Sequence, residues 1–196
     1  MTVRPATRDE IPRIAGVLAH AFAGDPPMRW VMGGSPDAER RLRPYFSALL
    51  KRLHLPHGEV WVSDDPFGAA AWIAPGGWPP SAGLELALAP ILLRTFARHP
   101  RRAAGAARVN GRDHPIERHW FLDYIGVEAT ARSRGTGSAL MQPVLERCDE
   151  EGVGAFLNAG SERSRELYAR HGFEVTKRVE LPHDGPPLWS MWRAPR

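Results

Sequence analysis

The chain has 196 residues and a single cysteine, and its 26 Lys and Arg side chains outnumber its 22 Asp and Glu side chains to give a formal charge of +4. The lone Cys148 excludes an intrachain disulfide, and so small a positive charge does not indicate a nucleic-acid-binding protein. We expect one domain, residues 1–196, because this length buries one substantial core. No 18-residue apolar run and no signal-peptide pattern is present, which predicts a cytoplasmic protein with no membrane partner.

The first third of the chain predicts a strand, two helices and a hairpin. Residues 2–6 have the character of a short strand. Thr7 followed by Glu10 has the pattern of a capping box, so a helix begins there and ends before the two prolines at 26–27. A second helix is expected over residues 37–54. Alternating apolar residues then predict antiparallel strands at 59–63 and 69–74.

Residues 28–32 are expected to form a loop that is unusually apolar for one exposed to solvent. Met28 and Trp30 are therefore candidate contacts for a substrate. The other interpretation is that Trp30 fills the edge of the core. The sequence does not decide between the two.

The rest of the chain alternates helices and strands. Helices are predicted at 82–98 and 101–117, then a strand at 119–127, a helix at 137–151, a strand at 155–158, a helix from Ser161 and a closing hairpin at 173–181 and 188–193. The Arg-rich segment 94–118 is either a solvated face or a docking surface for phosphates or an acidic partner. The pattern indicates an α/β fold, a mixed twisted sheet with helices on both faces.

A basic, glycine-bearing turn joins the strand at 119–127 to the helix at 137–151. Such a turn points backbone N–H groups at one place, at the positive end of the helix dipole, which favours a phosphate-sized anion. No Lys-Ser/Thr pair follows the second glycine and the G-x-G-x-x-G spacing is absent, so a Walker A loop and a dinucleotide loop are excluded. The candidate binding residues are Arg132, Ser133, Arg134, Gly135, Thr136, Gly137 and Ser138.

The Arg-x-x-Gly-x-Gly pattern of this turn resembles the pyrophosphate loop of the GNAT superfamily of acetyl-CoA-dependent N-acetyltransferases. Further along, Tyr168 to Phe173 is similar to the superfamily's Tyr-x-x-x-Gly-Phe element. The resemblance implies acetyl-CoA as cofactor and a GNAT-like, mostly antiparallel sheet with a splayed central strand pair. Five other segments resemble the puromycin N-acetyltransferase branch: residues 4–10, 60–62, 120–122, 126–127 and 189–193.

The resemblance also assigns residues to the cofactor. Tyr168 would donate a proton to the leaving thiolate, since a free thiol titrates at about 8.5, above neutral pH, and a proton donor therefore lowers the barrier to its departure. The main chain of Ile125, Gly126 and Val127 would pair with the pantetheine arm. Asn158 and Ser164, which stand where the branch often has Glu and Asn, complete the expected cofactor contacts.

The proton acceptor is the least defined part of the site. Asn158 cannot accept a proton, so Asp123 and Tyr124 are the remaining candidates, with Asp123 as the expected base and Tyr124 also a candidate substrate contact. Asp123 either acts in catalysis or pairs with Arg118 or His119. Without an acid at position 158, we expect acceptor amines of low pKa to be favoured.

The sequence thus predicts an enzyme that acetylates a primary amine of a small molecule, in the range of an aminonucleoside or related antibiotic. Two alternatives remain, a protein N-terminal or lysine acetyltransferase and an acyl-CoA-binding module that has lost catalysis. His54 and His57 lack further ligands at metal spacing, so no metal is expected. A monomer or homodimer with no nucleic-acid partner is expected.

Overall fold

A seven-stranded sheet forms the centre of the molecule, with strand order β1-β2-β3-β4-β5-β7-β6. The computed structural model describes residues 1–65, 67–128 and 135–196. Within these residues β4 and β5 pair in parallel and every other neighbouring pair is antiparallel, which confirms the predicted fold class. The strands are β1 (Val3–Pro5), β2 (Gly58–Ser63), β3 (Gly68–Ile73), β4 (His119–Val127), β5 (Gly154–Ala159), β6 (Glu174–Glu180) and β7 (Pro187–Arg193).

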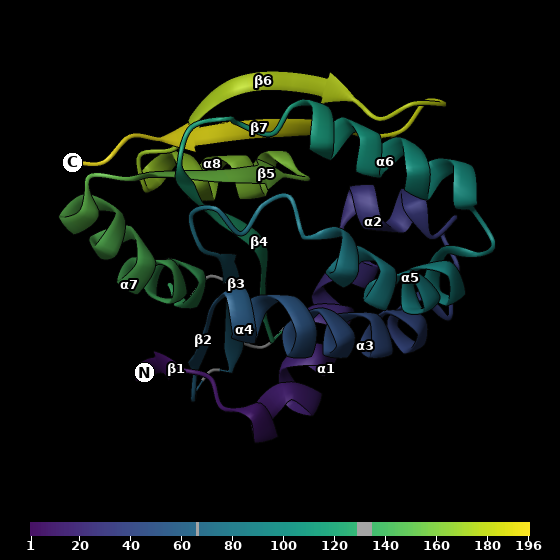
Figure 1. Ribbon diagram of the computed structural model, residues 1–196, viewed down its shortest axis with the longest axis horizontal. Helices are drawn as coiled ribbons and strands as arrows, with labels where there is room; N and C mark the ends of the chain where they lie inside the picture. Colours follow the sequence, from purple (N-terminus) through teal and green to yellow (C-terminus); the bar gives the residue numbers. More distant parts are fainter. Residues whose placement is uncertain (66, 129–134) are drawn as a thin grey trace.

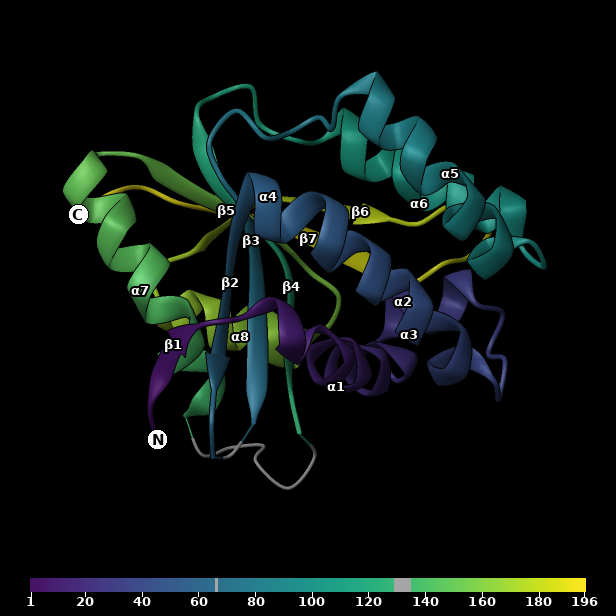
Figure 2. The ribbon, with the colours of Figure 1, turned by 60° about the horizontal axis from the view of Figure 1, so that its bottom comes forward.

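Helices cover both faces of the sheet (Figure 1). Figure 2 shows β2, β3 and β4 lying between α7 on one side and α1 and α3 on the other. No helix of the described residues is long and apolar enough to cross a membrane. The helices are α1 (Ile11–Ala23), α2 (Pro26–Val31), α3 (Ala38–Leu49), α4 (Leu55–His57), α5 (Ala82–Phe96), α6 (Pro100–Arg112), α7 (Thr136–Glu151) and α8 (Glu162–Arg170).

Strand β3 is buried along its whole length and separates two hydrophobic cores. Ala71 and Ile73 face α1 and α3, whereas Ala70 and Trp72 face α7. The alternation follows from the two-residue period of a strand. Cys148 of α7 lies fully buried in the second core, as predicted, and burial raises the pKa of its thiol to about 12.

The prediction of a loop at 28–32 is wrong, because α2 occupies most of this stretch. Asp25 accepts a hydrogen bond from the Met28 N–H at 3.2 Å and so caps the helix. Pro26 and Pro27 follow at the first helical positions, where a missing N–H costs little. The same two prolines that end α1 therefore begin α2.

Two other helices differ from the prediction. Helix α6 ends at Arg112 and not at 117, because the residue before Pro115 is disfavoured in helical conformation. The predicted helix 37–54 is α3 followed by a π-helical segment, Leu50–His54. A π turn changes the direction of the side chains that follow, and π turns often occur at functional sites.

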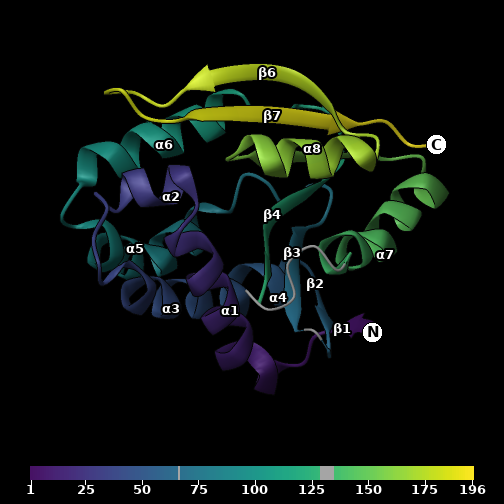
Figure 3. The same ribbon diagram turned by 180° about the vertical axis from the view of Figure 1, so that it is seen from behind.

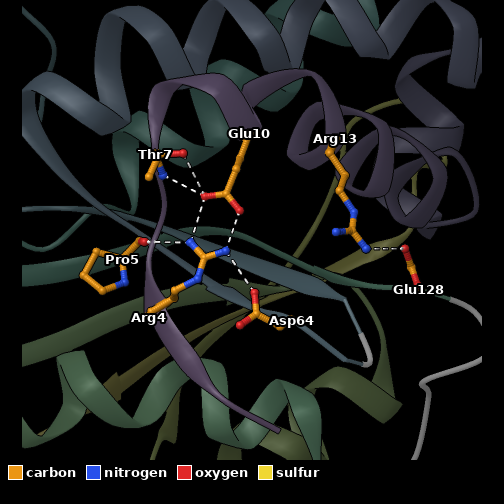
Figure 4. Close-up of polar contacts among 7 residues, drawn as sticks. All are labelled: Arg4, Pro5, Thr7, Glu10, Arg13, Asp64 and Glu128. Atoms are coloured by element: carbon orange, nitrogen blue, oxygen red, sulfur yellow. Dashed lines mark hydrogen bonds and ion pairs between the residues drawn. The ribbon is translucent and has the colours of Figure 1, made fainter.

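A polar network ties β1 to Thr7 and Glu10, which lie just before α1 (Figure 4). Arg4 of β1 donates to both carboxylate oxygens of Glu10, at 2.9 and 2.7 Å, and to Asp64 at 2.9 Å. Glu10 also accepts the Thr7 N–H at 2.9 Å, as the capping-box pattern predicts. The hydrogen bonds from Arg4, and then those from Thr7, lower the pKa of Glu10 to about 2.

We expect the free energy of unfolding of Glu10→Gln to fall less steeply than that of the wild type as the pH is lowered. The carboxylate titrates lower in the folded than in the unfolded chain, so its contribution is complete above the unfolded value, near 4.3, and is lost as the pH falls toward about 2. Urea unfolding from pH 7 to pH 2.5 should show wild type and variant converging as the pH falls. Glu85→Gln is the control, since Glu85 is exposed and has no ion pair among the described residues. Parallel pH curves for wild type and Glu10→Gln would contradict the prediction.

Candidate active site

The parallel pairing of β4 with β5 ends half-way along β4. The last matched pair is Leu122 with Leu157, after which β4 continues to Val127 beside β3 alone. At the same point the register on the β3 side shifts, from Trp72 opposite Leu122 to Ala71 opposite Tyr124, so Asp123 is the extra residue of a β-bulge. Beyond Asp123, the main chain of β4 on the β5 side has no strand partner among the described residues. The predicted splayed strand pair is present.

A groove of about 770 Å³ opens where the two strands part. It is lined by the end of β4, the start of α7, one face of α8 and Ala21 of α1. Of the predicted cofactor contacts that the structure describes, all except Asn158 belong to this lining. The predicted contacts Arg132, Ser133 and Arg134 lie outside the described residues. The predicted residues in the lining are Ile125, Gly126, Val127, Gly135, Thr136, Gly137, Ser138, Ser164 and Tyr168.

One end of the groove has the chemistry of an anion site. Gly135 stands at the N-cap of α7 with φ 78°, a left-handed conformation that suits glycine, and provides no side chain to cap the helix. The first N–H groups of a helix have no partners within it and carry partial positive charge. The hydroxyl of Thr136 is buried and has no hydrogen-bond partner among the described residues. These groups fit the diphosphate of a coenzyme A.

The start of α7 is held in place by α8. Ser138 Oγ lies 2.8 Å from His171 Nε2 at the end of α8, and burial lowers the pKa of His171. Ser161 begins α8 by accepting the Ser164 N–H, and Ser164 Oγ in turn accepts the Ser161 N–H at 3.1 Å. Helix α8 lies beside β5 and β7 (Figure 3). The predicted contacts Ser138 and Ser164 thus also fix the two walls of the groove.

Tyr168 lies on the groove side of α8 and is 6% exposed. Burial raises the pKa of its hydroxyl, and the charge of Asp25 raises it further. None of the described residues hydrogen-bonds to this hydroxyl. It therefore stays protonated and free to donate toward the groove.

Two carboxylates lie near the point where the strands part. Asp123 Oδ2 is 3.0 Å from Nε2 of His54, which is 1% exposed and belongs to the π-helical segment. The predicted partners Arg118 and His119 are wrong: His119 instead meets the Glu117 carbonyl and His114. The sequence had suggested His54 only as half of an incomplete metal pair, since its contact with Asp123 depends on the packing of α3 against β4.

Asp25 is the second carboxylate, and sequence analysis missed it. Its Oδ1 faces the backbone of Gly160 so closely that a Cβ there would lie 2.7 Å away. Burial raises the pKa of Asp25 to about 6 against the effect of its hydrogen bond from the Met28 N–H. An Asp directly before two prolines is a helix N-cap signal, and it could have been recognised as one.

Comparison with known proteins agrees with this geometry. A profile of the Acetyltransferase (GNAT) family matches residues 44–173 of the chain. The chain belongs to the GNAT acetyltransferase family. This GNAT chain is also 31% identical over 78 residues to the Uncharacterized N-acetyltransferase C550.08 of Schizosaccharomyces pombe, a match covering 39% of this chain and 32% of that protein. The match spans about a third of that relative's length.

Solved structures share the fold. A crystal structure described as histone acetyltransferase HPA2 and related acetyltransferase, from Corynebacterium glutamicum, matches 100% of this GNAT chain and 96% of its own, with a TM-score of 0.76 and 30% identity. Arylalkylamine N-acetyltransferase 2 from Aedes aegypti matches with a TM-score of 0.65 over 100% of this chain and 99% of its own. Its identity is 12%, so this second likeness shows the fold alone.

Five of the predicted residues lie outside the groove lining of this GNAT domain: Met28, Trp30, Asp123, Tyr124 and Asn158. The Trp30 carbonyl accepts a hydrogen bond from Arg102 of α6 at 3.0 Å, and the Arg102 guanidinium lies 5.3 Å from the indole ring. Met28 packs against the core beneath α1 and α3. Asn158 donates to Asn110 of α6 at 3.3 Å and accepts from Ser190 at 2.9 Å. Helix α6 therefore covers this side of the site.

Tyr124 of β4 packs against Tyr45 of α3. The Tyr124 hydroxyl lies 2.8 Å from that of Tyr45, and burial, followed by the charge of Asp123, raises both pKa values. Tyr124 thus faces the α3 side of the sheet with Asp123. Among the described residues no group of three or more His, Cys, Asp and Glu side chains is arranged to hold a metal ion.

We expect Gly137→Val to weaken binding of acetyl-CoA, the acetyl donor of GNAT enzymes, at least about tenfold, or 1.4 kcal/mol. A Cβ at this position fits, 3.5 Å from Leu167, but the added methyl groups project where the diphosphate approaches the helix N-terminus. Gly83→Val is the matched control: Gly83 is likewise the second residue of its helix, α5, and has open space around it. Calorimetry should show the loss only for Gly137→Val. Equal affinities for the two variants would contradict it.

Proposed function

We propose that the protein is an acetyl-CoA-dependent N-acetyltransferase that acts on a primary amine of a small molecule. The observation that carries the proposal is the groove itself, which joins an unpaired strand edge at 125–127, an uncapped helix N-terminus at Gly135 and the free hydroxyl of Tyr168. These three features suit a pantetheine arm, a diphosphate and a departing thiolate respectively. Bound acetyl-CoA supplies the thioester whose acetyl group passes to the amine.

Each of the chain's own groups has a part in this proposal. The N–H groups of α7 and the Thr136 hydroxyl hold the diphosphate. The main chain of Ile125 to Val127 orients the pantetheine arm, and Tyr168 donates its hydroxyl proton to the leaving sulfur. Asp123 is fixed at the bulge by its hydrogen bond with His54.

The cover formed by α6 supports a small acceptor. Arg102 ties α6 to α2, Asn110 ties it to β5, and Gly105 lies against Pro182, where a Cβ would come within 2.6 Å of the ring. These contacts fix α6 over α2 and the end of β5, and a covered site of this kind suits a small acceptor better than an extended peptide. The resemblance to the puromycin N-acetyltransferase branch makes aminonucleosides and related antibiotics the first acceptors to test.

A protein acceptor is the second candidate, because one solved relative at 30% identity is described as a histone acetyltransferase. Thiol release from acetyl-CoA distinguishes the candidates when it is measured with aminonucleosides, aminoacyl amides, polyamines and histone-tail peptides. Turnover with small amines and none with peptides supports the proposal. Preferential turnover with peptides would replace it, and binding of acetyl-CoA without turnover of any amine would favour a binding module.

We expect Tyr168→Phe to lower kcat by about 10²–10⁴-fold, the range of general acid catalysis, while the KM for acetyl-CoA changes little. The reason is that a proton donor to the leaving sulfur acts in the transition state. Tyr45→Phe is the control, since Tyr45 is as buried as Tyr168 but lies outside the groove. Steady-state kinetics with the best acceptor amine provides the measurement. An unchanged kcat with chemistry rate-limiting would show that Tyr168 serves only packing.

A further inference from the structure

Asp25 does not itself line the groove but lies next to residues that do. Ala21, one helical turn before it, lines the groove, and so do Tyr168 and Ser161. The Asp25 carboxylate meets the chain at Gly160, the residue just before Ser161. Glycine at 160 is what permits this approach, because any Cβ there would also come within 2.9 Å of Pro27. The carboxylate is thus held where α1, α2 and the end of β5 meet beside Tyr168.

Capping of α2 uses only one oxygen of this carboxylate. Oδ2 accepts the Met28 N–H at 3.2 Å, and Oδ1 has no hydrogen-bond partner among the described residues. Asp37, the acid at the start of α3, makes an instructive contrast, since its carboxylate pairs with Arg40 at 2.8 Å and with Arg98 at 3.1 Å. No Lys, Arg or His of the described residues pairs with Asp25. Burying a carboxylate without a counter-ion is costly, and a cationic ligand bound beside Asp25 would offset that cost.

The groups around Asp25 that the structure describes carry no charge, so they do not neutralise its carboxylate. From α8 the titratable group that faces it is Tyr168, which stays neutral. From α1, α2 and the end of β5 the neighbours are Gly24, Pro27, Met28 and Gly160, none of which titrates. Burial alone accounts for the raised pKa of Asp25, about 6, which is in the range of a general base that works at neutral pH.

We propose that Asp25 binds the ammonium group of the acceptor through Oδ1 and accepts its proton before the amine attacks. This inference rests on the proposed acetyltransferase function and names the acceptor's class, a primary ammonium ion. The ammonium nitrogen keeps the electron pair of the broken N–H bond, Asp25 becomes neutral, and its proton then passes to solvent. Asp25 thereby supplies the proton acceptor that Asn158 cannot provide.

Asp123, the base predicted from the sequence, differs from Asp25 in two respects. Its carboxylate is already hydrogen-bonded to His54, and it lies on the α3 side of the sheet, whereas Asp25 lies next to Ser161 and Tyr168 of the groove lining. Asp25 has a free oxygen and lies beside the proposed acid, Tyr168. We therefore assign the proton transfer to Asp25.

The first test needs no acceptor of known identity. Methylammonium chloride, the smallest primary ammonium ion, is titrated into the protein while the Asp25 carboxyl carbon is followed by ¹³C NMR, with Asp25→Asn used for the assignment. Binding to the charged form should lower the pKa of Asp25 below about 6, whereas tetramethylammonium, which has no N–H, should not. Equal responses to both ions, or none to methylammonium, would overturn the inference.

The second test is the pH profile of kcat/KM with an amine that the wild type acetylates. Wild-type values should rise through about pH 6 and then level off, because ionised Asp25 uses the abundant ammonium form. Asp25→Asn keeps the helix cap, since Asn caps as well as Asp. Its kcat/KM should be about 10²–10⁴-fold lower at pH 7 and rise tenfold per pH unit, following the free amine.

Asp37→Asn and Asp123→Asn complete the series. Asp37→Asn should retain the wild-type profile, because Asp37 lies away from the groove. If Asp123→Asn loses the plateau and Asp25→Asn keeps it, the base is Asp123 and the inference fails while the acetyltransferase function stands. If the wild type neither binds acetyl-CoA by calorimetry nor releases its thiol with any amine, the proposed function fails. The methylammonium titration then still decides whether Asp25 is an ammonium site.

Discussion

The loss of pairing between β4 and β5 is the constraint on which the rest of this molecule depends. A sheet is stable because its main-chain groups are paired, yet here the parallel ladder stops at Leu122 and Leu157 and leaves the end of β4 open. The bulge at Asp123 coincides with this break, and the hydrogen bond between Asp123 and His54 anchors β4 to the α3 layer at the same point. An unpaired strand edge inside a protein needs a partner, and the groove beside it is shaped for one.

Packing around the break brings three distant parts of the chain together. Helix α7 points its N-terminus into the groove and α8 adds Tyr168, while the junction of α1 and α2 places Asp25 next to the groove, against Gly160. The link between Ser138 and His171 holds the first two at a fixed separation. The diphosphate-binding end and the reacting end are therefore set by one rigid arrangement, which favours orientation of two substrates toward each other.

The two carboxylates illustrate how one type of side chain acquires two roles from its surroundings. Asp123 has a hydrogen-bond donor in His54, which fixes it at the bulge. Among the described residues, Asp25 has a single backbone donor and no counter-ion, and burial raises its pKa to about 6. Different surroundings give two carboxylates of one active site different pKa values, so that one can serve in proton transfer and the other in electrostatic stabilisation.

The sequence by itself determined the fold class, the bounds of β4, the helix α7 and most of the groove lining. These depend on local signals: strand alternation, helical periodicity, glycines at a helix start and the capping serine of α8. Only the tertiary structure decided where β4 leaves β5, that His54 is the partner of Asp123, and that Asp25 meets Gly160. Each of these is a contact between segments far apart in the chain, and no local pattern of residues encodes which of them will meet. Asn158 shows the same limit, because its place beside Asn110 follows from how α6 crosses the site.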